Sequence, residues 1–243
     1  EFRRVLFRSF PLLKEDKKVN TELVKISQSF NRNFRDRNFR NSFKPVHKEK
    51  VVERLAREGL LPAIFFIFSR AGCDNAVKHC AHLNLTSESE KVIIRERIEE
   101  VAQLISPEDY GPLNFLGWAK ALELGVAAHH AGLIPPLKEV IEELFQQGLI
   151  KVVFATETLA LGVNMPAKSV VIDRLTKWNG QAHVDISPGE FTQLTGRAGR
   201  RGIDVEGHAV MVWSPEVDIP SLAGLATARR SEEHTSELQS RFG

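Results

Sequence analysis

Arginines and glycines are concentrated between Gln193 and Gly202, where the sequence reads Gln-Leu-Thr-Gly-Arg-Ala-Gly-Arg-Arg-Gly. Arginine suits a polyphosphate ligand because its charge is permanent and its N–H donors form a fixed fork. Just before this stretch, Ser187-Pro188-Gly189-Glu190 has the pattern of a capping box with proline at the first helical position, which predicts a helix start. Gln193, Arg197 and Arg200 are spaced at i, i+4 and i+7, so we expect them on one stripe of that helix.

The alternative for these arginines is a solvated basic helix end, whose cations complement the helix dipole. Gly196, Gly199 and Gly202 argue against it, because glycine inside a helix costs about 1 kcal/mol relative to alanine. Glycines placed between arginines instead indicate a close approach of the backbone. We therefore favour phosphate contacts over a solvated helix end.

A second stretch, residues 154–166, reads Phe-Ala-Thr-Glu-Thr-Leu-Ala-Leu-Gly-Val-Asn-Met-Pro. The two stretches resemble motifs V and VI of superfamily 2 helicases, in the superkiller-type DExH-box branch associated with RNA turnover, and above all its actinobacterial members. The resemblance covers roughly Val46 to Asp218. It implies that the chain carries the second RecA-like domain of an ATP-dependent RNA helicase.

The resemblance also implies roles for individual residues. Arg197 and Arg200 would act as arginine fingers on the γ-phosphate of ATP, with Gln193 as a third catalytic side chain. An arginine finger contributes about 10³ to 10⁵ in rate. The residues expected to contact the nucleotide are Gly162, Asn164, Gly196, Arg197 and Arg200.

Apolar runs alternate with amphipathic helical patterns along the chain. Continuous or short apolar runs, typical of buried parallel strands, occupy residues 63–68, 126–128, 150–155, 169–172 and 208–213. Helical patterns occupy residues 51–60, 73–83, 90–105 and 136–147. This alternation predicts an α/β fold, with a doubly wound, mostly parallel sheet and helices on both faces. By the resemblance, the fold is RecA-like.

Polar residues follow three of the predicted strands, and ligands of such sheets bind beyond the carboxyl ends of the strands. Serine and threonine hydroxyls and backbone amides next to glycine can donate hydrogen bonds to phosphate oxygens, but they do not distinguish one base from another. We therefore expect contacts to a nucleic-acid backbone at this edge. The residues expected to make them are Ser69, Arg70, His130, Gly132, Thr156, Glu157 and Thr158.

Other interpretations remain open for some of these residues. A helix N-cap explains Ser69 and Thr156 equally well, and both roles are compatible. A zinc site at His129 and His130 is disfavoured because no third ligand stands at a suitable spacing. We expect no metal bound by this chain.

The composition narrows the class of protein further. The formal net charge is +2 over 243 residues, so any nucleic-acid contact must come from a local patch rather than a global field. Cys73 and Cys80 are the two cysteines, and we expect buried free thiols rather than a disulfide. No apolar run approaches the ~18 residues of a membrane span. We expect a cytoplasmic protein without membrane contact.

The two ends of the chain have an unusual relation. A single DNA string encodes Glu1–Ser9 on one strand and Arg230–Leu238 on the other, and it resembles a sequencing adapter. We expect residues 1–9 and 230–243 to be translated adapter. Residues 10–45 are expected to be an interdomain linker, although arginine interleaved with phenylalanine can also grip single strands. Residues 46–218 would be the helicase C-terminal domain, and residues 219–229 the start of a further segment.

A complete motor also needs a Gly-x-x-x-x-Gly-Lys-Ser/Thr loop and an Asp-Glu pair for magnesium, and neither pattern occurs here. The expected cofactors, ATP and Mg²⁺, would be bound mainly by a first RecA-like domain acting in cis. The expected partners are single-stranded RNA or a 3′ overhang and RNA-degradation machinery. The alternatives are a DNA-repair helicase, disfavoured because those tend to have proline in place of Glu157 and Arg201, and a nucleic-acid-binding module without motor activity.

Overall fold

The computed structural model describes residues 10–16, 18–34, 37, 46–162, 164–215 and 217–228. The chain divides into two compact units, one formed by Val46–Val212 and the other by the stretches on either side of it. The segments that we expect to be translated adapter, Glu1–Ser9 and Arg230–Gly243, lie outside the described residues.

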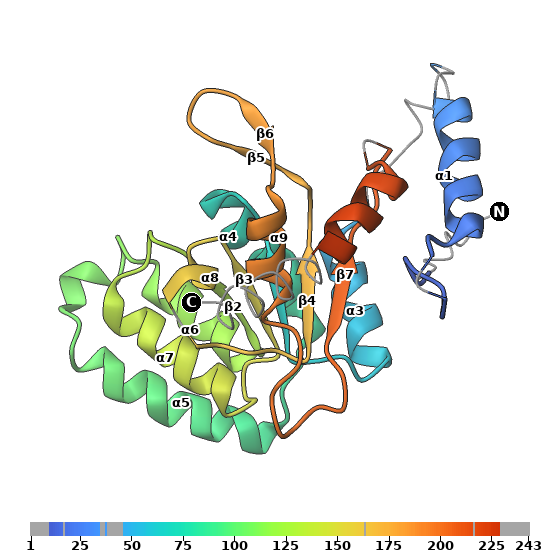
Figure 1. The fold of residues 1–243 in the computed structure, drawn as a ribbon. Helices are drawn as coiled ribbons and strands as arrows, with labels where there is room; N and C mark the ends of the chain where they lie inside the picture. Colours follow the sequence, from blue (N-terminus) through green and yellow to red (C-terminus); the bar gives the residue numbers. More distant parts are fainter. Residues whose placement is uncertain are drawn as a thin grey trace, which may run out of the picture. The chain divides into compact units, whose positions relative to one another are not determined.

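A five-stranded parallel sheet forms the centre of the Val46–Val212 unit, with the strand order β2-β3-β1-β4-β7 (Figure 1). The strands are β1 (Ala63–Phe66), β2 (Val126–His129), β3 (Val152–Ala155), β4 (Ser169–Ile172) and β7 (His208–Met211). Each of them lies within or beside an apolar run that the sequence singles out. The predicted α/β fold with a parallel sheet is confirmed.

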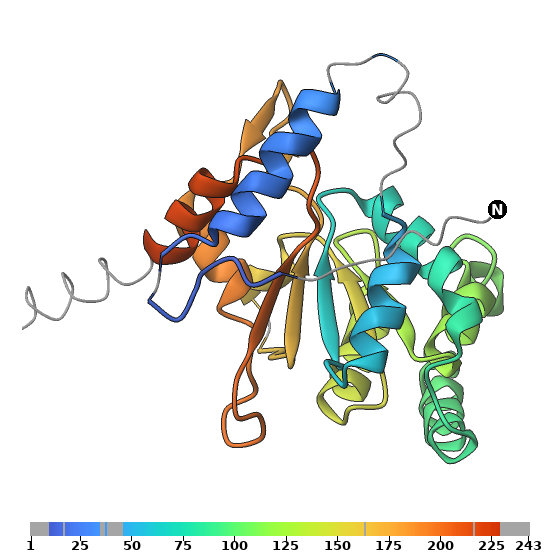
Figure 2. The same ribbon diagram turned by 90° about the vertical axis from the view of Figure 1, so that its right-hand side faces the viewer.

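Helices cover both faces of this sheet. They are α3 (Lys48–Arg57), α4 (Arg70–Cys80), α5 (Glu88–Ala102), α6 (Phe115–Glu123), α7 (Pro135–Gln146), α8 (Leu159–Gly162) and α9 (Pro188–Thr195), with 3₁₀ turns η1 (Ala81–Leu83) and η2 (Pro107–Asp109). The connection from β1 to β2 runs one way across the sheet, whereas those from β2 to β3, β3 to β4 and β4 to β7 run the other way. Right-handed crossovers therefore put α4 on one face and α7, α8 and α9 on the opposite face, as Figure 2 shows for α4 and α9.

The core lies between the sheet and these helices. Phe65 of β1 and Phe154 of β3 are completely buried, with ring centroids 5.5 Å apart. The apolar stripe predicted for α7 is also buried; it consists of Leu137, Val140, Ile141, Leu144 and Phe145. Cys73 and Cys80 are buried free thiols, as expected, and burial raises the pKa of each to about 12.

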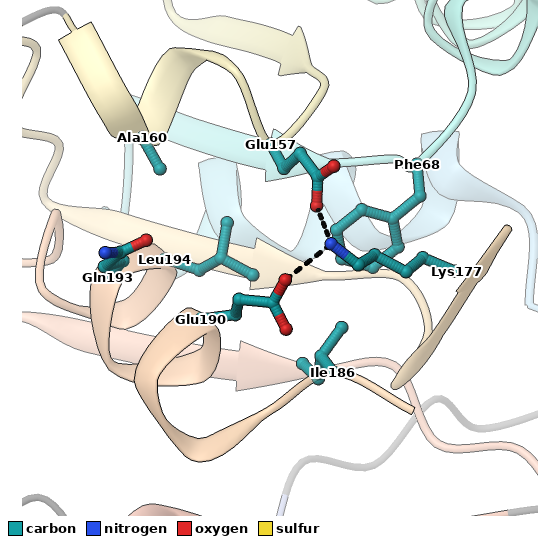
Figure 3. Close-up of a pocket in the computed structure, with 8 residues that line it drawn as sticks. All are labelled: Phe68, Glu157, Ala160, Lys177, Ile186, Glu190, Gln193 and Leu194. Atoms are coloured by element: carbon teal, nitrogen blue, oxygen red, sulfur yellow. Dashed lines mark hydrogen bonds and ion pairs between the residues drawn. The ribbon is translucent and has the colours of Figure 1, made fainter. Parts of the chain in front are cut away.

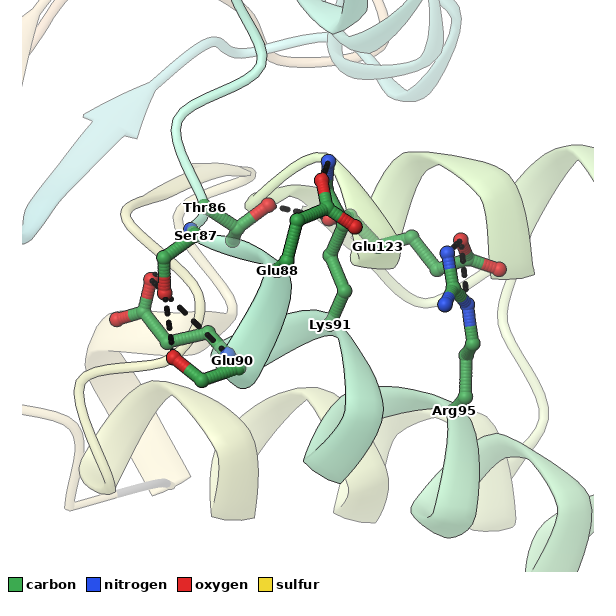
Figure 4. A network of polar contacts seen from close by, with 8 residues as sticks. Thr86, Ser87, Glu88, Glu90, Lys91, Arg95 and Glu123 are labelled. Atoms are coloured by element: carbon green, nitrogen blue, oxygen red, sulfur yellow. Dashed lines mark hydrogen bonds and ion pairs between the residues drawn. The ribbon is translucent and has the colours of Figure 1, made fainter.

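A polar network braces the amino end of α5 (Figure 4). Ser87 and Glu90 form a capping box, and the Glu90 carboxylate also accepts a hydrogen bond of 2.6 Å from Lys151, which precedes β3. Farther along α5, the Arg95 guanidinium binds the Glu123 carboxylate of α6 through Nε at 3.0 Å and Nη2 at 2.9 Å. Because β2 and β3 begin beside these contacts, the network stabilises the edge of the sheet where the strands start.

A two-stranded antiparallel hairpin, β5 (Thr176–Trp178) and β6 (His183–Asp185), extends between β4 and α9. We did not predict this hairpin or α6 from the sequence. Each hairpin strand has only 3 residues and none of them is buried, so no apolar run marks these strands in the sequence. The Trp178 ring is 56% exposed and lies edge-on to the His183 ring at 5.3 Å.

The second unit contains a helix where the sequence analysis expects a linker without periodic structure. Asn20 caps α1 (Thr21–Phe34) by accepting the Glu22 N–H at 3.0 Å. Within the same unit, the Phe30 ring lies edge-on to Trp213 at 4.8 Å, and residues 219–228 are helical. Part of the expected linker is therefore helical. Of the helices among the described residues, none is both long and apolar enough to cross a membrane.

Candidate phosphate and nucleic-acid site

The parallel register brings the loops after β1, β2 and β3 together at one edge of the sheet. The Ile67 N–H donates to the Ala155 carbonyl at 2.8 Å, and the Thr156 N–H donates to the His129 carbonyl at 3.3 Å. Each loop is thus bonded to its neighbour immediately beyond the strands. The expected strand-binding residues lie on these three loops, so the predicted juxtaposition is present.

Ser69 and Arg70 mark the start of α4. Ser69 is the N-cap, and its hydroxyl accepts the Gly72 N–H at 3.1 Å. Arg70 is exposed, and a Cβ atom added to Gly132 would lie 3.8 Å from its Cδ atom. The exposed arginine therefore stands beside the glycine loop that follows β2.

His130 is committed to holding that glycine loop. Its Nδ1 accepts the Gly132 N–H at 3.1 Å, so Nε2 must carry the proton that it shares with the Asp74 carboxylate at 3.0 Å. The side chain is buried, at 6% exposure. Any contact from His130 to a nucleic acid would therefore come from the loop backbone and not from the imidazole.

The neighbouring His129 also has a protein partner. Its Nε2 lies 2.7 Å from the Glu142 carboxylate of α7, and its Nδ1 is buried with no hydrogen-bond partner. Burial lowers the pKa of this imidazole, which favours the neutral form with the proton on Nε2. In the described part of the chain, no three His, Cys, Asp or Glu side chains are grouped as metal ligands would be.

The loop after β3 leads into α8. The Thr156 and Thr158 hydroxyls are 2.9 Å apart and share a hydrogen bond. The Glu157 carboxylate, which we expected to contact nucleic acid, instead accepts a hydrogen bond of 2.5 Å from Lys177 of β5. Lys177 thus neutralises the charge of Glu157 within the protein. This pairing explains why Glu157 is present in the motif without any contact to a phosphate backbone.

A cavity of about 250 Å³ lies between this loop, the hairpin and α9 (Figure 3). The residues that line it are Phe68, Glu157, Ala160, Lys177, Ile186, Glu190, Gln193 and Leu194. Lys177 lies between Glu157 and Glu190, with both distances at 2.5 Å. Its hydrogen bond and those from Ser187 lower the pKa of Glu190 to about 2. The three side chains tie the base of the hairpin to the loop after β3 and to α9.

The capping box predicted at Ser187 and Glu190 is present at the start of α9. The helix ends at Thr195, however, with Gly196 as its C-cap. Arg197 and Arg200 lie beyond the helix, so the expectation that they share a helical stripe with Gln193 was wrong. The backbone reaches φ +91° at Gly199, a left-handed conformation that no helix continues through.

Arg197 is joined to the motif at residues 154–166. Its carbonyl accepts the Ala167 N–H at 2.9 Å, and the Gly199 N–H donates to the Ala167 carbonyl at 2.7 Å. Its Nη2 donates to the Ala160 carbonyl of α8 at 2.5 Å. Side chain and backbone together fix this arginine against the segment around α8.

Of the three glycines expected to mark a close backbone approach, Gly199 does so, and the segment that it approaches is the protein's own backbone at Gly207; Gly202 has nothing within 4 Å of an added Cβ atom. A Cβ atom on Gly207 would lie 2.4 Å from both the Ala198 carbonyl carbon and the Gly199 nitrogen. The backbone leading into β7 therefore passes directly against the arginine loop, which we define as residues 196–204. Only glycine fits at this crossing.

Arg200 is held by a carboxylate of the same loop. Asp204 accepts hydrogen bonds from Arg200 Nε and Nη2, each at 2.8 Å, and from the Arg200 backbone N–H at 2.9 Å. The Asp204 side chain is only 5% exposed, and the Arg200 side chain 22%. The hydrogen bonds from Arg200 lower the pKa of Asp204 to about 2.

The remaining candidate residues flank these elements. Gly162 is the last residue of α8, and Gly196 caps α9. Asn164 is exposed, and its carbonyl accepts a hydrogen bond of 3.4 Å from the Gln146 side chain of α7. Gln193 lies on α9, exposed at the wall of the cavity. Asp204 and Lys177 were missed by sequence reasoning, although a carboxylate four residues after an arginine was a readable signal for the first.

Known proteins are similar to this chain in sequence. The family described as the helicase conserved C-terminal domain matches residues 75–202. The chain is 53% identical over 189 residues to the probable helicase HelY of Mycobacterium tuberculosis, covering 77% of this chain and 21% of that protein. It is 46% identical to the DExH-box ATP-dependent RNA helicase DExH15 chloroplastic of Arabidopsis thaliana, covering 71% of this chain and 15% of that protein.

The Superkiller complex protein 2 of Homo sapiens is 41% identical over 192 residues, covering 79% of this chain and 15% of that protein. The chain thus spans about a fifth or less of the length of the curated relatives it matches. The matched residues include the motif at residues 154–166, the arginine-bearing motif at residues 193–202, and strands β2, β3 and β4 of the parallel sheet. The chain belongs to the superfamily 2 DExH-box helicases and carries their conserved C-terminal, RecA-like domain.

Proposed function

We propose that the intact protein is an ATP-dependent RNA helicase that moves along one strand in the 3′ to 5′ direction. This chain would supply the arginine fingers and half of the strand-binding surface. The observation that carries the proposal is the fixed arginine loop: Arg197 is hydrogen-bonded to α8, and Arg200 is held by Asp204. Both guanidinium groups are therefore oriented before any ligand binds, as electrostatic stabilisation of a developing charge requires.

The donor set of the arginine loop fits a polyphosphate. Arginine carries five N–H donors, of which Asp204 uses two on the Arg200 side chain, so three can face a phosphate. ATP would be bound mainly by the first RecA-like domain, which would also hold Mg²⁺. From this chain, Arg197 and Arg200 would reach the γ-phosphate when the two domains close, with Gln193, Gly162, Asn164 and Gly196 beside the nucleotide.

The edge beyond β1, β2 and β3 would bind the strand. Arg70 and the Ser69, Thr156 and Thr158 hydroxyls offer donors to phosphate oxygens, and the loop at Gly132 offers backbone amides. These groups recognise the sugar-phosphate backbone and not the bases. The loop that ends in Thr158 runs directly into α8, and α8 binds Arg197. The residues proposed to bind the strand and an arginine proposed to reach the nucleotide are therefore connected through α8.

RNA is favoured over DNA by the names of two relatives, an RNA helicase and a superkiller complex protein. By its likeness to a superkiller complex protein, RNA-degradation machinery is the proposed partner. We also propose the cytoplasm as the location. The test is ATP hydrolysis by the full-length protein, with RNA or DNA of the same sequence as the stimulating strand. Stronger stimulation by DNA supports a DNA-repair helicase, and no hydrolysis with either strand supports a binding module without motor activity.

Arg200→Ala and Arg200→Lys variants separate catalysis from binding. We expect both variants to bind RNA with wild-type affinity and to lose most hydrolysis, because a lysine cannot reproduce the guanidinium fork. Full hydrolysis by folded Arg200→Ala protein would refute the assignment of Arg200 to the γ-phosphate.

A further inference from the structure

Asp204 holds Arg200 in the arginine loop, and the strength and direction of this hold have a consequence for catalysis. Asp204 lies at the end of the arginine loop, and its side chain is 5% exposed. It accepts three hydrogen bonds from Arg200, two from the guanidinium and one from the backbone N–H. A carboxylate buried to this degree is costly unless it is paired, so its placement beside this arginine calls for a physical reason.

We propose that Asp204 is a positioning residue that sets the orientation of Arg200 toward the γ-phosphate, an inference that rests on the proposed function. The two side-chain bonds occupy Nε and Nη2, which form one edge of the planar guanidinium. The plane is thereby fixed, and the two Nη1–H donors and the second Nη2–H donor are left to face a ligand. The hydrogen bond from the Arg200 backbone N–H to Asp204 also holds the backbone from which this side chain extends.

The orientation matters because an arginine side chain has several rotatable bonds and pays for their ordering when it binds. A finger that is ordered in advance meets the transferring phosphate without that cost. Arg197 is bonded to α8 independently of Asp204, so the fold sets the position of the Arg200 backbone. Asp204 then decides where its guanidinium points.

The opposite effect is the main competitor. If the carboxylate competed with the γ-phosphate for Arg200, removing its charge would release the finger and raise the rate. The geometry favours positioning, because the bidentate pair leaves three N–H donors of Arg200 for a phosphate and does not require the pair to break.

The experiment uses the full-length protein with Asp204→Asn. Asparagine has nearly the same shape, but its amide nitrogen faces an N–H donor, so the bidentate fork is lost. We expect kcat for RNA-stimulated ATP hydrolysis to fall roughly 10- to 100-fold, as a small misplacement of a reacting group can cost about 10² in rate. The KM for ATP should change less than about twofold, because the interaction is made mainly in the transition state.

A second readout separates positioning from folding. ADP with aluminium fluoride imitates the transferring phosphoryl group, whereas ADP alone does not. Asp204→Asn should weaken binding of ADP with aluminium fluoride by a factor similar to the loss in kcat and leave ADP binding unchanged. A purely structural role would lower the folded fraction and reduce the amount of protein that binds either ligand equally. All rates are compared per folded molecule, well below the unfolding temperature of the variant.

Glu123→Gln is the matched control. Glu123 also binds an arginine through Nε and Nη2, but it does so just before β2. Strands β3 and β1 separate β2 from β4 and β7, and the residues preceding β4 and β7 contact the arginine loop. It should leave kcat and both affinities unchanged. Wild-type or higher kcat in folded Asp204→Asn protein would overturn the proposal. If Arg200→Ala also kept its full rate, the proposed function of Arg200 would fail instead, so the two failures can be told apart.

Discussion

Replacing Arg200 by alanine should destabilise the fold, contrary to what a solvent-facing helical position would imply. The carboxylate of Asp204 is 5% exposed and would lose its charged partner. The hydrogen bonds from Arg200 are the largest cause of the fall in the pKa of Asp204 from 3.8 to about 2. At 1.36 kcal/mol for each tenfold change in acidity, that fall corresponds to about 2 kcal/mol of stabilisation.

The assay is urea unfolding of this chain at 25 °C, followed by circular dichroism. The hydrogen bond from the backbone N–H of residue 200 and the charge of Lys168 also lower the pKa of Asp204 and remain in the variant. At pH 7 we therefore expect Arg200→Ala to lower the free energy of unfolding by about 1 to 2 kcal/mol, or the melting temperature by roughly 2 to 8 °C for a unit of this size. Since the folded-state pKa of Asp204 lies below its unfolded value, the stabilisation is present above about pH 4 and is lost as the pH falls toward 2. The difference between wild type and variant should therefore shrink over that range.

A double-mutant cycle isolates the pair. The coupling free energy between Arg200→Ala and Asp204→Asn should be about 1 to 2 kcal/mol, because removing the second partner relieves the unpaired charge. For the more exposed pair of Arg95 and Glu123, the same cycle should give less than about 1 kcal/mol. A variant as stable as wild type at pH 7, or a loss of stability that does not change down to pH 2, would refute the reasoning.

Four further outcomes are expected. Lys177→Met should lower the melting temperature at pH 7, because Glu157 and Glu190 lose their shared cation. The difference from wild type should diminish as the pH falls from about 4.5 toward 2, the depressed pKa of Glu190. A difference that does not change with pH would contradict the assignment, and Lys177→Arg is the charge-retaining control. Burial lowers the pKa of His129, so the stability contributed by the neutral imidazole should be present above about pH 6.5 and decline at lower pH. The unfolding free energy of His129→Gln should decline less over the same pH range. This chain alone should hydrolyse no ATP, with or without RNA, in a phosphate-release assay, and measurable turnover would disprove that it forms only half of the nucleotide site. RNA affinity of the full-length protein, measured by fluorescence anisotropy, should fall steeply with salt and vary little with base sequence, whereas salt-independent affinity would exclude backbone recognition.

Local patterns were enough to predict the parallel sheet and most of the helices. A continuous apolar run such as residues 63–68 leaves few alternatives to a buried strand, and the spacing of α7 defines a single apolar face. The Ser187–Glu190 capping box acts between neighbours in the sequence, so it too was predictable. The rule that ligands bind beyond the carboxyl ends of parallel strands was sufficient to gather Ser69, Gly132 and Thr156 at one edge.

Contacts between distant residues decided the rest. Helical spacing placed Arg197 and Arg200 on α9, but hydrogen bonds to Ala167, 30 residues earlier in the chain, end the helix and draw the arginines into a loop. The partners of Glu157, Glu190 and His130 likewise come from other elements: Lys177 of the hairpin and Asp74 of α4. The sequence by itself determined which residue types were available for phosphate chemistry. Only the tertiary structure decided which of them were already paired, because pairing depends on loops whose backbone conformation the local sequence does not determine.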